Sequence, residues 1–257
     1  MKRKGSKVWQ IAFLQYKHQL KRTDFWIVLA TVFLLFSEIL NGAGRGFSEV
    51  GRRISFFEIF PVLLREADIL FVLMIGTLFL ISDIPRGHAG YEVGVLRTSR
   101  GIWYRAQWLY AVWIGGTYVL FIHLSALVFY LPAVNLSITS ARGTPGNILR
   151  EWFCYMILFL FLHMVFTGIC CVCNLLGRSA GVGILINGVL IFLLYPYIAN
   201  GQSLGFWSPV EVFVRYQSGN KVGFPGAIGY FICLCLILYF MGRWRVRKAD
   251  IVFEAFR

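Results

Sequence analysis

The residues of this sequence that could do chemistry are ionisable and amide side chains lying inside apolar stretches. They are Glu38, Asp68, His123, His163, Asn174 and Asn187. Such groups are costly in the middle of a bilayer, and where they occur they often line a transport path or pair with a partner. We expect Glu38, Asp68, His163 and Asn187 to be pathway or intramembrane polar residues.

No motif of a hydrolase or a metalloenzyme accompanies these residues. The sequence lacks His-Glu-x-x-His and Gly-x-Ser-x-Gly, and its glycine-rich segment 181–188 has no Lys to reach a phosphate. All six cysteines lie in apolar stretches, and only the pair Cys170 and Cys173 could hold a soft metal. We therefore expect no metal, no ATP hydrolysis by this chain, and a transport subunit rather than an intramembrane enzyme.

Composition excludes an ordinary soluble protein. Of the 257 residues, 58% are hydrophobic and 14% are charged, whereas about a quarter are charged in a typical soluble domain. The formal net charge is +13, but the basic residues flank apolar runs, where membrane topology explains them. A nucleic-acid partner is therefore the weaker interpretation, and membrane lipid is the stronger one.

The apolar runs predict an all-α membrane protein with six transmembrane helices in a single transmembrane domain, residues 1–257. A span of about 20 apolar residues crosses a ~30 Å hydrocarbon core. The expected spans are about 25–44, 61–82, 106–131, 152–177, 179–198 and 222–242. An even number of spans places both termini on one side. The segments on that side hold 17 Lys and Arg residues against 8 in the other loops, so both termini are predicted to be cytoplasmic.

Two segments outside the spans stand out. Within the segment 1–24, an apolar face at helical spacing comprises Trp9, Ala12, Phe13, Tyr16 and Leu20, with basic residues on the other faces. This pattern predicts an amphipathic helix lying in the cytoplasmic interface. The link between spans two and three is about 23 residues long, far more than a helical hairpin needs. Its mixture of apolar and charged residues predicts a docking surface.

This layout resembles the type-2 ATP-binding cassette (ABC) transporter permease family. The shared features are the in-plane basic helix, six spans with both ends inside, and a long first cytoplasmic loop carrying a Glu, a Leu and a Thr/Ser-rich basic stretch. Glu92, Leu96 and the segment 98–100 match that loop, although Arg100 stands where family members often have Pro. The segment 204–213 is similar to the family's partly re-entrant piece before span six.

The resemblance implies a permease subunit, an exporter, coupled to separate ATPase subunits that bind ATP and Mg. It also implies a homodimer or a heterodimer with a related permease. The ATPase-coupling residues would be Tyr91, Glu92, Val95, Leu96, Arg97 and Arg100. An alternative is a secondary transporter that uses Glu38 or Asp68 as a proton-linked carboxylate.

Overall fold

The computed structural model describes residues 2–49, 75–80, 99–130, 145–177, 182, 184–189, 209–217 and 223–248, and within these ranges the regular structure is entirely helical. The helices are α1 (Lys2–Leu20), α2 (Thr23–Glu49), α6 (Arg100–Tyr130), α7 (Pro145–Gly177), α9 (Pro209–Gln217) and α10 (Phe224–Lys248). Shorter helical segments cover 75–80 and 184–189. The predicted all-α class is confirmed for this part of the chain.

Three of the described helices are long and apolar enough to cross a membrane: Gly101–Ser125, Trp152–Cys173 and Phe224–Arg247. They correspond to the predicted spans 106–131, 152–177 and 222–242. The helices exceed the predicted bounds, because α6 begins at Arg100, α7 begins at Pro145 and α10 continues to Lys248. With 31 residues, α6 is about 46 Å long at ~1.5 Å per residue. It is therefore longer than a bilayer core.

The other three predicted spans are described only in part. The predicted span 25–44 lies within α2, and the part of it identified as apolar among the described side chains is Thr23–Leu35. Of the predicted spans 61–82 and 179–198, the described helical pieces are 75–80 and 184–189, together with residue 182. Six spans therefore remain a prediction.

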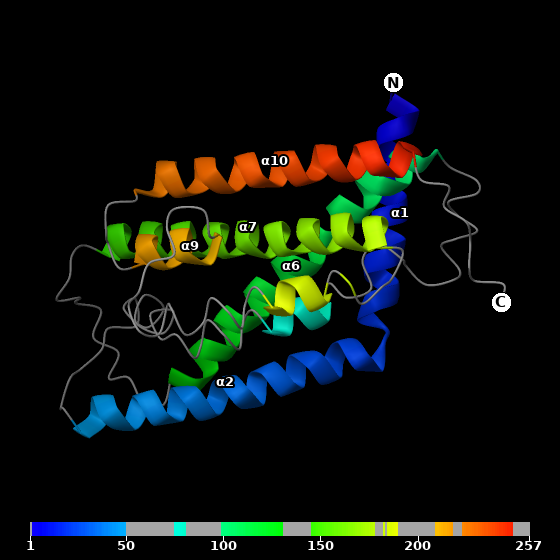
Figure 1. Ribbon diagram of the computed structural model, residues 1–257. Helices are drawn as coiled ribbons and strands as arrows, with labels where there is room; N and C mark the ends of the chain where they lie inside the picture. The colour runs from blue at the N-terminus through cyan, green and yellow to red at the C-terminus, as the bar shows by residue number, and fades with distance from the viewer. Residues whose placement is uncertain are drawn as a thin grey trace.

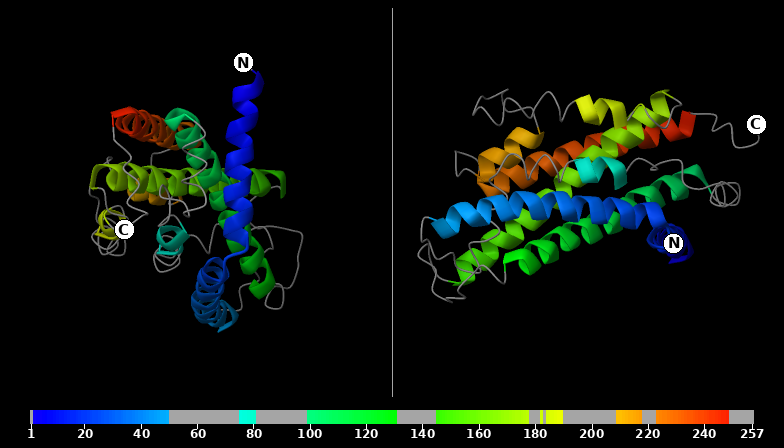
Figure 2. Two further views of the ribbon diagram at one scale, coloured as in Figure 1. Left: turned by 90° about the vertical axis from the view of Figure 1, so that its right-hand side faces the viewer. Right: turned by 90° about the horizontal axis from the view of Figure 1, so that it is seen from below.

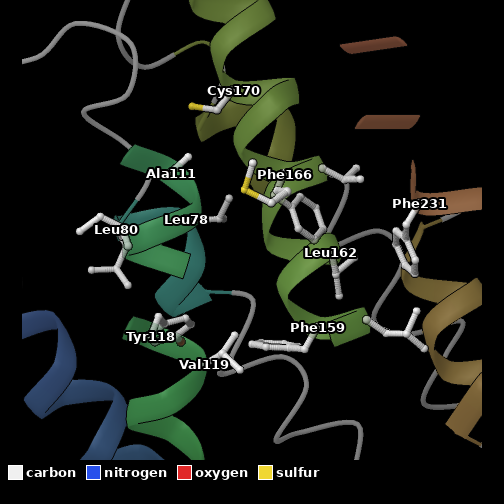
Figure 3. Packing of buried hydrophobic residues seen from close by; sticks show 14 of the residues in the cluster. Leu78, Leu80, Ala111, Tyr118, Val119, Phe159, Leu162, Phe166, Cys170 and Phe231 are labelled. Carbon is white, nitrogen blue, oxygen red and sulfur yellow. The ribbon is translucent and has the colours of Figure 1, made fainter. Parts of the chain in front are cut away.

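At the centre of the bundle is the middle of α7. Every residue from 162 to 168 is buried, which means that neighbours enclose α7 on all sides at this level. The neighbours at this level include α6, α10 and the segments 75–80 and 184–189, and Figures 1 and 2 show α6 and α10 running past α7. Figure 3 shows Phe159, Leu162 and Phe166 of α7 in this core, with Leu78 of the segment 75–80 and Phe231 of α10.

Helix α1 lies crosswise at the end of the bundle where α2 and α6 begin and α10 ends (Figures 1 and 2). Its rings surround Trp113 of α6, with ring centroids at 5.3 Å for Trp9, 5.9 Å for Phe13 and 5.7 Å for Tyr16. The Tyr16 hydroxyl and Thr117 Oγ1 share a hydrogen bond of 2.7 Å. Helix α1 therefore lies across the ends of α2 and α6, and its expected place in a membrane interface stays a prediction.

The buried face of α1 differs from the apolar face that the sequence predicts. Ala12, Gln15 and Gln19 are buried, whereas Trp9 is 57% exposed and Phe13 is 54% exposed. The contact with α6 is centred on the Ala12 side of the predicted face, because small and amide side chains allow the crossing helices to approach. The aromatic edge of α1 therefore rests on Trp113 and keeps its outer surface open.

The helix ends that meet at this end of the bundle (Figure 1) carry most of the basic residues of the described ranges. They come from α1, from the turn that follows it, from the start of α6 and from the end of α10: Lys2, Arg3, Lys4, Lys7, Lys17, Lys21, Arg22, Arg100, Arg105, Arg243, Arg245, Arg247 and Lys248. In the described ranges, the remaining basic residues are Arg45, Arg150 and Arg215. The charge of the described part is thus strongly polarised along the bundle axis.

Candidate functional site

His163 is the centre of the most buried polar group in the bundle. It lies near the middle of the Trp152–Cys173 span and is 1% exposed. Its Nδ1 lies 3.4 Å from Oγ1 of Thr77, which is itself buried, and Thr167 Oγ1 donates a 2.9 Å hydrogen bond to the His163 carbonyl oxygen. His163 Nε2 is buried and has no hydrogen-bond partner in the described structure. The histidine thus joins α7 to the segment 75–80.

Two glycines bring the neighbouring backbones close to this group. A Cβ placed on Gly115 of α6 would lie 2.9 Å from His163 Nε2 and nearer still to Cδ2. A Cβ placed on Gly76 would lie 2.8 Å from Tyr118 Cζ and would collide with the Tyr118 hydroxyl oxygen. The rings of Tyr118 and His163 are 6.3 Å apart. Each ring therefore fills a notch that only glycine leaves open.

The side chain of Asn187 contacts α7 about one turn beyond His163. Its side chain is fully buried, and Nδ2 donates a 2.9 Å hydrogen bond to the carbonyl oxygen of Phe166. Its Oδ1 is also buried and has no partner among the described residues. The structure thus brings His163 and Asn187, two of the residues expected from the sequence, onto adjacent turns of α7.

Thr77, Tyr118 and the two glycine notches are parts of this site that the sequence analysis did not single out. The sequence feature that could have indicated Thr77 and Tyr118 is a single hydroxyl group inside an apolar run. Such a signal is weak, because a Tyr or Thr in a membrane helix most often bonds to its own backbone or packs. Their grouping depends on contacts between residues far apart in the chain, such as the 86 positions between Thr77 and His163.

Helix α9 carries a buried acidic residue, Glu211. Phe213 packs on Phe159 with ring centroids 6.0 Å apart, and Tyr216 packs on Tyr155 at 5.2 Å. Phe159 lies seven residues into the Trp152–Cys173 span, or about 10 Å along the helix. Helix α9 therefore runs beside the span and antiparallel to it. The re-entrant segment that the family resemblance implies over 204–213 stays a prediction.

A second junction lies at the basic end, where α6 begins. Ser99 accepts backbone hydrogen bonds from Ile102 and Trp103, so the helix starts directly after it. Tyr104 is buried against α10, with its ring 5.6 Å from that of Tyr239 and its hydroxyl against Gly242. The first turns of α6 are thus held to the last turns of α10.

The remaining expected site residues are only partly placed. Glu38 lies on α2 and Arg100 is the first residue of α6, but their side chains are not described. Asp68, Tyr91, Glu92, Val95, Leu96 and Arg97 lie outside the described residues. Their proposed roles stay predictions.

Within the described ranges, no group of three His, Cys, Asp or Glu residues could hold a metal ion. Cys170 and Cys171 are buried free thiols, and Cys173 is half-buried. No protein-family model and no curated protein sequence matches the chain. The described residues define a helical protein with three helices that could span a membrane, one of which carries the buried His163.

Proposed function

We propose that this chain is the membrane-spanning permease subunit of an ATP-driven ABC transporter of the type-2 class, working as an exporter. It has six spans with both termini in the cytoplasm and forms a homodimer or a heterodimer with a related permease. Separate ATPase subunits bind ATP and Mg, and the chain itself is not an enzyme. The cell membrane is its location.

The observation that carries this proposal is the junction of α6 with α10 at the basic end of the bundle. Positively charged residues collect on the cytoplasmic side of membrane proteins, which supports a cytoplasmic position for this end. Because Tyr104 is wedged against Tyr239 and Gly242, a force on the chain just before α6 would move α6 and α10 together. A transporter needs such a mechanical link between nucleotide binding and the membrane helices.

In this proposal the loop that precedes α6 docks on the ATPase. Tyr91 and Val95 are spaced i, i+4 in a helix, and Glu92 and Leu96 form the neighbouring pair. Apolar anchors would supply affinity, and Glu92, Arg97 and Arg100 would set the orientation of the partner.

The test uses the full chain purified from its own host together with its partners. We expect an ATP-hydrolysing subunit to co-purify, and we expect Leu96→Asp or Glu92→Arg to release it while the variant still inserts in the membrane. Arg86→Gln is the matched control in the same loop. Retention of an active ATPase by both variants would contradict the docking role, and the absence of any ATPase from the wild-type preparation would contradict the transporter class.

The orientation has its own test. Single cysteines at Arg142 and Lys221 in a cysteine-free chain should react with an impermeant thiol reagent on intact cells, and a cysteine at Arg97 should not. Labelling at Arg97 from outside would overturn the cytoplasmic placement of the loop.

The buried imidazole favours a second candidate, a proton-coupled secondary transporter. His163 Nε2 is buried and has no hydrogen-bond partner among the described residues, and an intramembrane ionisable group can relay protons. Transport that is abolished by a protonophore and is independent of ATP would favour this candidate over the ABC class.

A further inference from the structure

The outward face of α1 combines aromatic and basic side chains. Trp9, Phe13 and Lys17 follow one another at i, i+4 spacing on α1, Lys21 comes four residues later in the turn that ends the helix, and all four are exposed. Lys7 is also exposed, on the side of the outward face away from Trp9. We call these five residues the α1 ridge. Residues four apart on a helix lie about 6 Å from one another, so the ridge passes from an aromatic half to a basic half.

The opposite face of α1 is fixed to the bundle, so the α1 ridge cannot turn inward. The hydrogen bond between Tyr16 and Thr117 and the burial of Ala12 and Gln15 hold this face against α6. Because Trp9 and Phe13 also touch Trp113, their inner edges lie on the protein and more than half of each side chain stays open. Helix α1 lies at the end of the candidate spans (Figure 1).

The charges on the α1 ridge have no acidic partner in the described structure. The ion pair at this end joins Arg22 to Asp24, and none of Lys7, Lys17 and Lys21 is in a salt bridge with a described residue. An anionic occupant would complement these three lysines. An occupant with an apolar part would also cover Trp9 and Phe13. Trp and Phe are common on the apolar face of helices that lie in a membrane interface.

We propose that the α1 ridge binds anionic phospholipids of the leaflet on which α1 lies. The lysines hold the headgroup phosphates, and the aromatic half contacts the upper acyl chains. Helices with a basic polar face and exposed aromatic residues bind anionic interfaces in this way. A soluble acidic protein would satisfy the lysines but would leave Trp9 and Phe13 to water unless it also offered apolar groups. The proposal rests on the membrane location given above and does not depend on the ATPase partner.

The test uses the full-length chain purified in neutral detergent, with dioleoyl phosphatidylglycerol as the probe and dioleoyl phosphatidylcholine and free glycerol phosphate as comparisons. Bound lipid is counted by native mass spectrometry, and affinity is measured from the shift in melting temperature during titration. A basic residue near an anionic surface contributes about 1 kcal/mol, or roughly fivefold in affinity. The triple variant Lys7→Gln, Lys17→Gln, Lys21→Gln should therefore bind phosphatidylglycerol roughly a hundredfold more weakly.

Three further variants separate the possible causes. The triple Lys→Arg variant at the same positions keeps the charge and should keep the affinity. Arg150→Gln removes an exposed charge at the other end of the bundle and should have no effect. Trp9→Ala with Phe13→Ala should weaken lipid binding; because both rings also pack on Trp113, the lipid-induced shift in melting temperature is measured relative to the same variant in lipid-free detergent.

The outcomes decide the proposal clearly. Equal retention of phosphatidylglycerol by wild type and the triple Gln variant overturns it, as does equal affinity for phosphatidylcholine. Glycerol phosphate binding as tightly as the lipid would show a phosphate site without a lipid role. Loss of a co-purifying ATPase in the triple Gln variant, with lipid binding unchanged, would assign the α1 ridge to a protein partner instead.

Discussion

Replacing Gly115 by Ala should destabilise the bundle through the His163 ring. The added methyl group would lie 2.9 Å from Nε2, closer to Cδ2, and 3.1 Å from Leu160 Cδ1. Because His163 is enclosed on all sides, the ring cannot swing away without displacing Thr77 or Tyr118. Overpacking of this kind costs about 1–3 kcal/mol.

Gly116 supplies a control of the same kind one residue away. A Cβ at Gly116 meets no atom within 4 Å, and both glycines lie in the interior of α6. Replacing Gly by Ala in a helix interior raises helix propensity and stabilises the helix by up to about 1 kcal/mol. Both variants gain this stabilisation equally. The difference between Gly115→Ala and Gly116→Ala therefore isolates the contact with His163, and we expect Gly115→Ala to be less stable by about 1–3 kcal/mol.

The measurement is the free energy of unfolding of the full chain in dodecyl maltoside micelles titrated with dodecyl sulfate, followed by circular dichroism. A double-mutant cycle with His163→Ala completes it, because removing the ring should relieve much of the cost of Gly115→Ala. The reasoning is refuted if Gly115→Ala is as stable as Gly116→Ala, or if His163→Ala leaves the cost of the methyl group unchanged.

Two further predictions concern contacts that position α1 and the start of α6. Tyr16→Phe should lower the free energy of unfolding by about 1 kcal/mol through loss of the bond to Thr117. Thr117→Val also removes the bond that Thr117 Oγ1 donates to the Trp113 carbonyl oxygen, so the double variant should lose less than the sum of the two single losses, and additive effects would mean that the bond between Tyr16 and Thr117 does not contribute. Gly242→Ala should destabilise the chain because its Cβ would collide with the Tyr104 hydroxyl, whereas Gly229→Ala, with no atom within 4 Å, should not. Tyr104→Phe removes the colliding oxygen and should restore part of the stability of Gly242→Ala, and a Gly242→Ala chain as stable as Gly229→Ala would contradict the wedge at this junction.

Sequence reasoning located α6, α7 and α10 because each depends on a property that is local in the chain. A backbone in hydrocarbon must satisfy its hydrogen bonds within the helix, so a long apolar run is sufficient to predict a helix. The residues at which these helices begin and end were less predictable from the sequence. Trp103 and Tyr104 belong to α6 although they precede the predicted span at 106, because their burial against Val246 of α10 stabilises the extra turns.

Among the candidate site residues, His163 and Asn187 could be selected from the sequence, since a polar side chain in an apolar run is visible without any structure. Their partners could not. The contacts of His163 with Thr77 and Gly115 join residues that are far apart along the chain, and hydropathy carries no information about which helix lies beside which.

The sequence by itself determined the helical class, the long apolar helices and the excess of basic charge, because these follow from composition and from the period of the helix. Only the tertiary structure decided which face of α1 is buried. The apolar period predicts a buried face that includes Trp9 and Phe13, yet the crossing with α6 buries Ala12 of that face together with Gln15 and Gln19 and leaves the two aromatic residues more than half exposed. Close approach of two backbones requires small or flexible side chains at the crossing point, and the position of that point depends on both helices together.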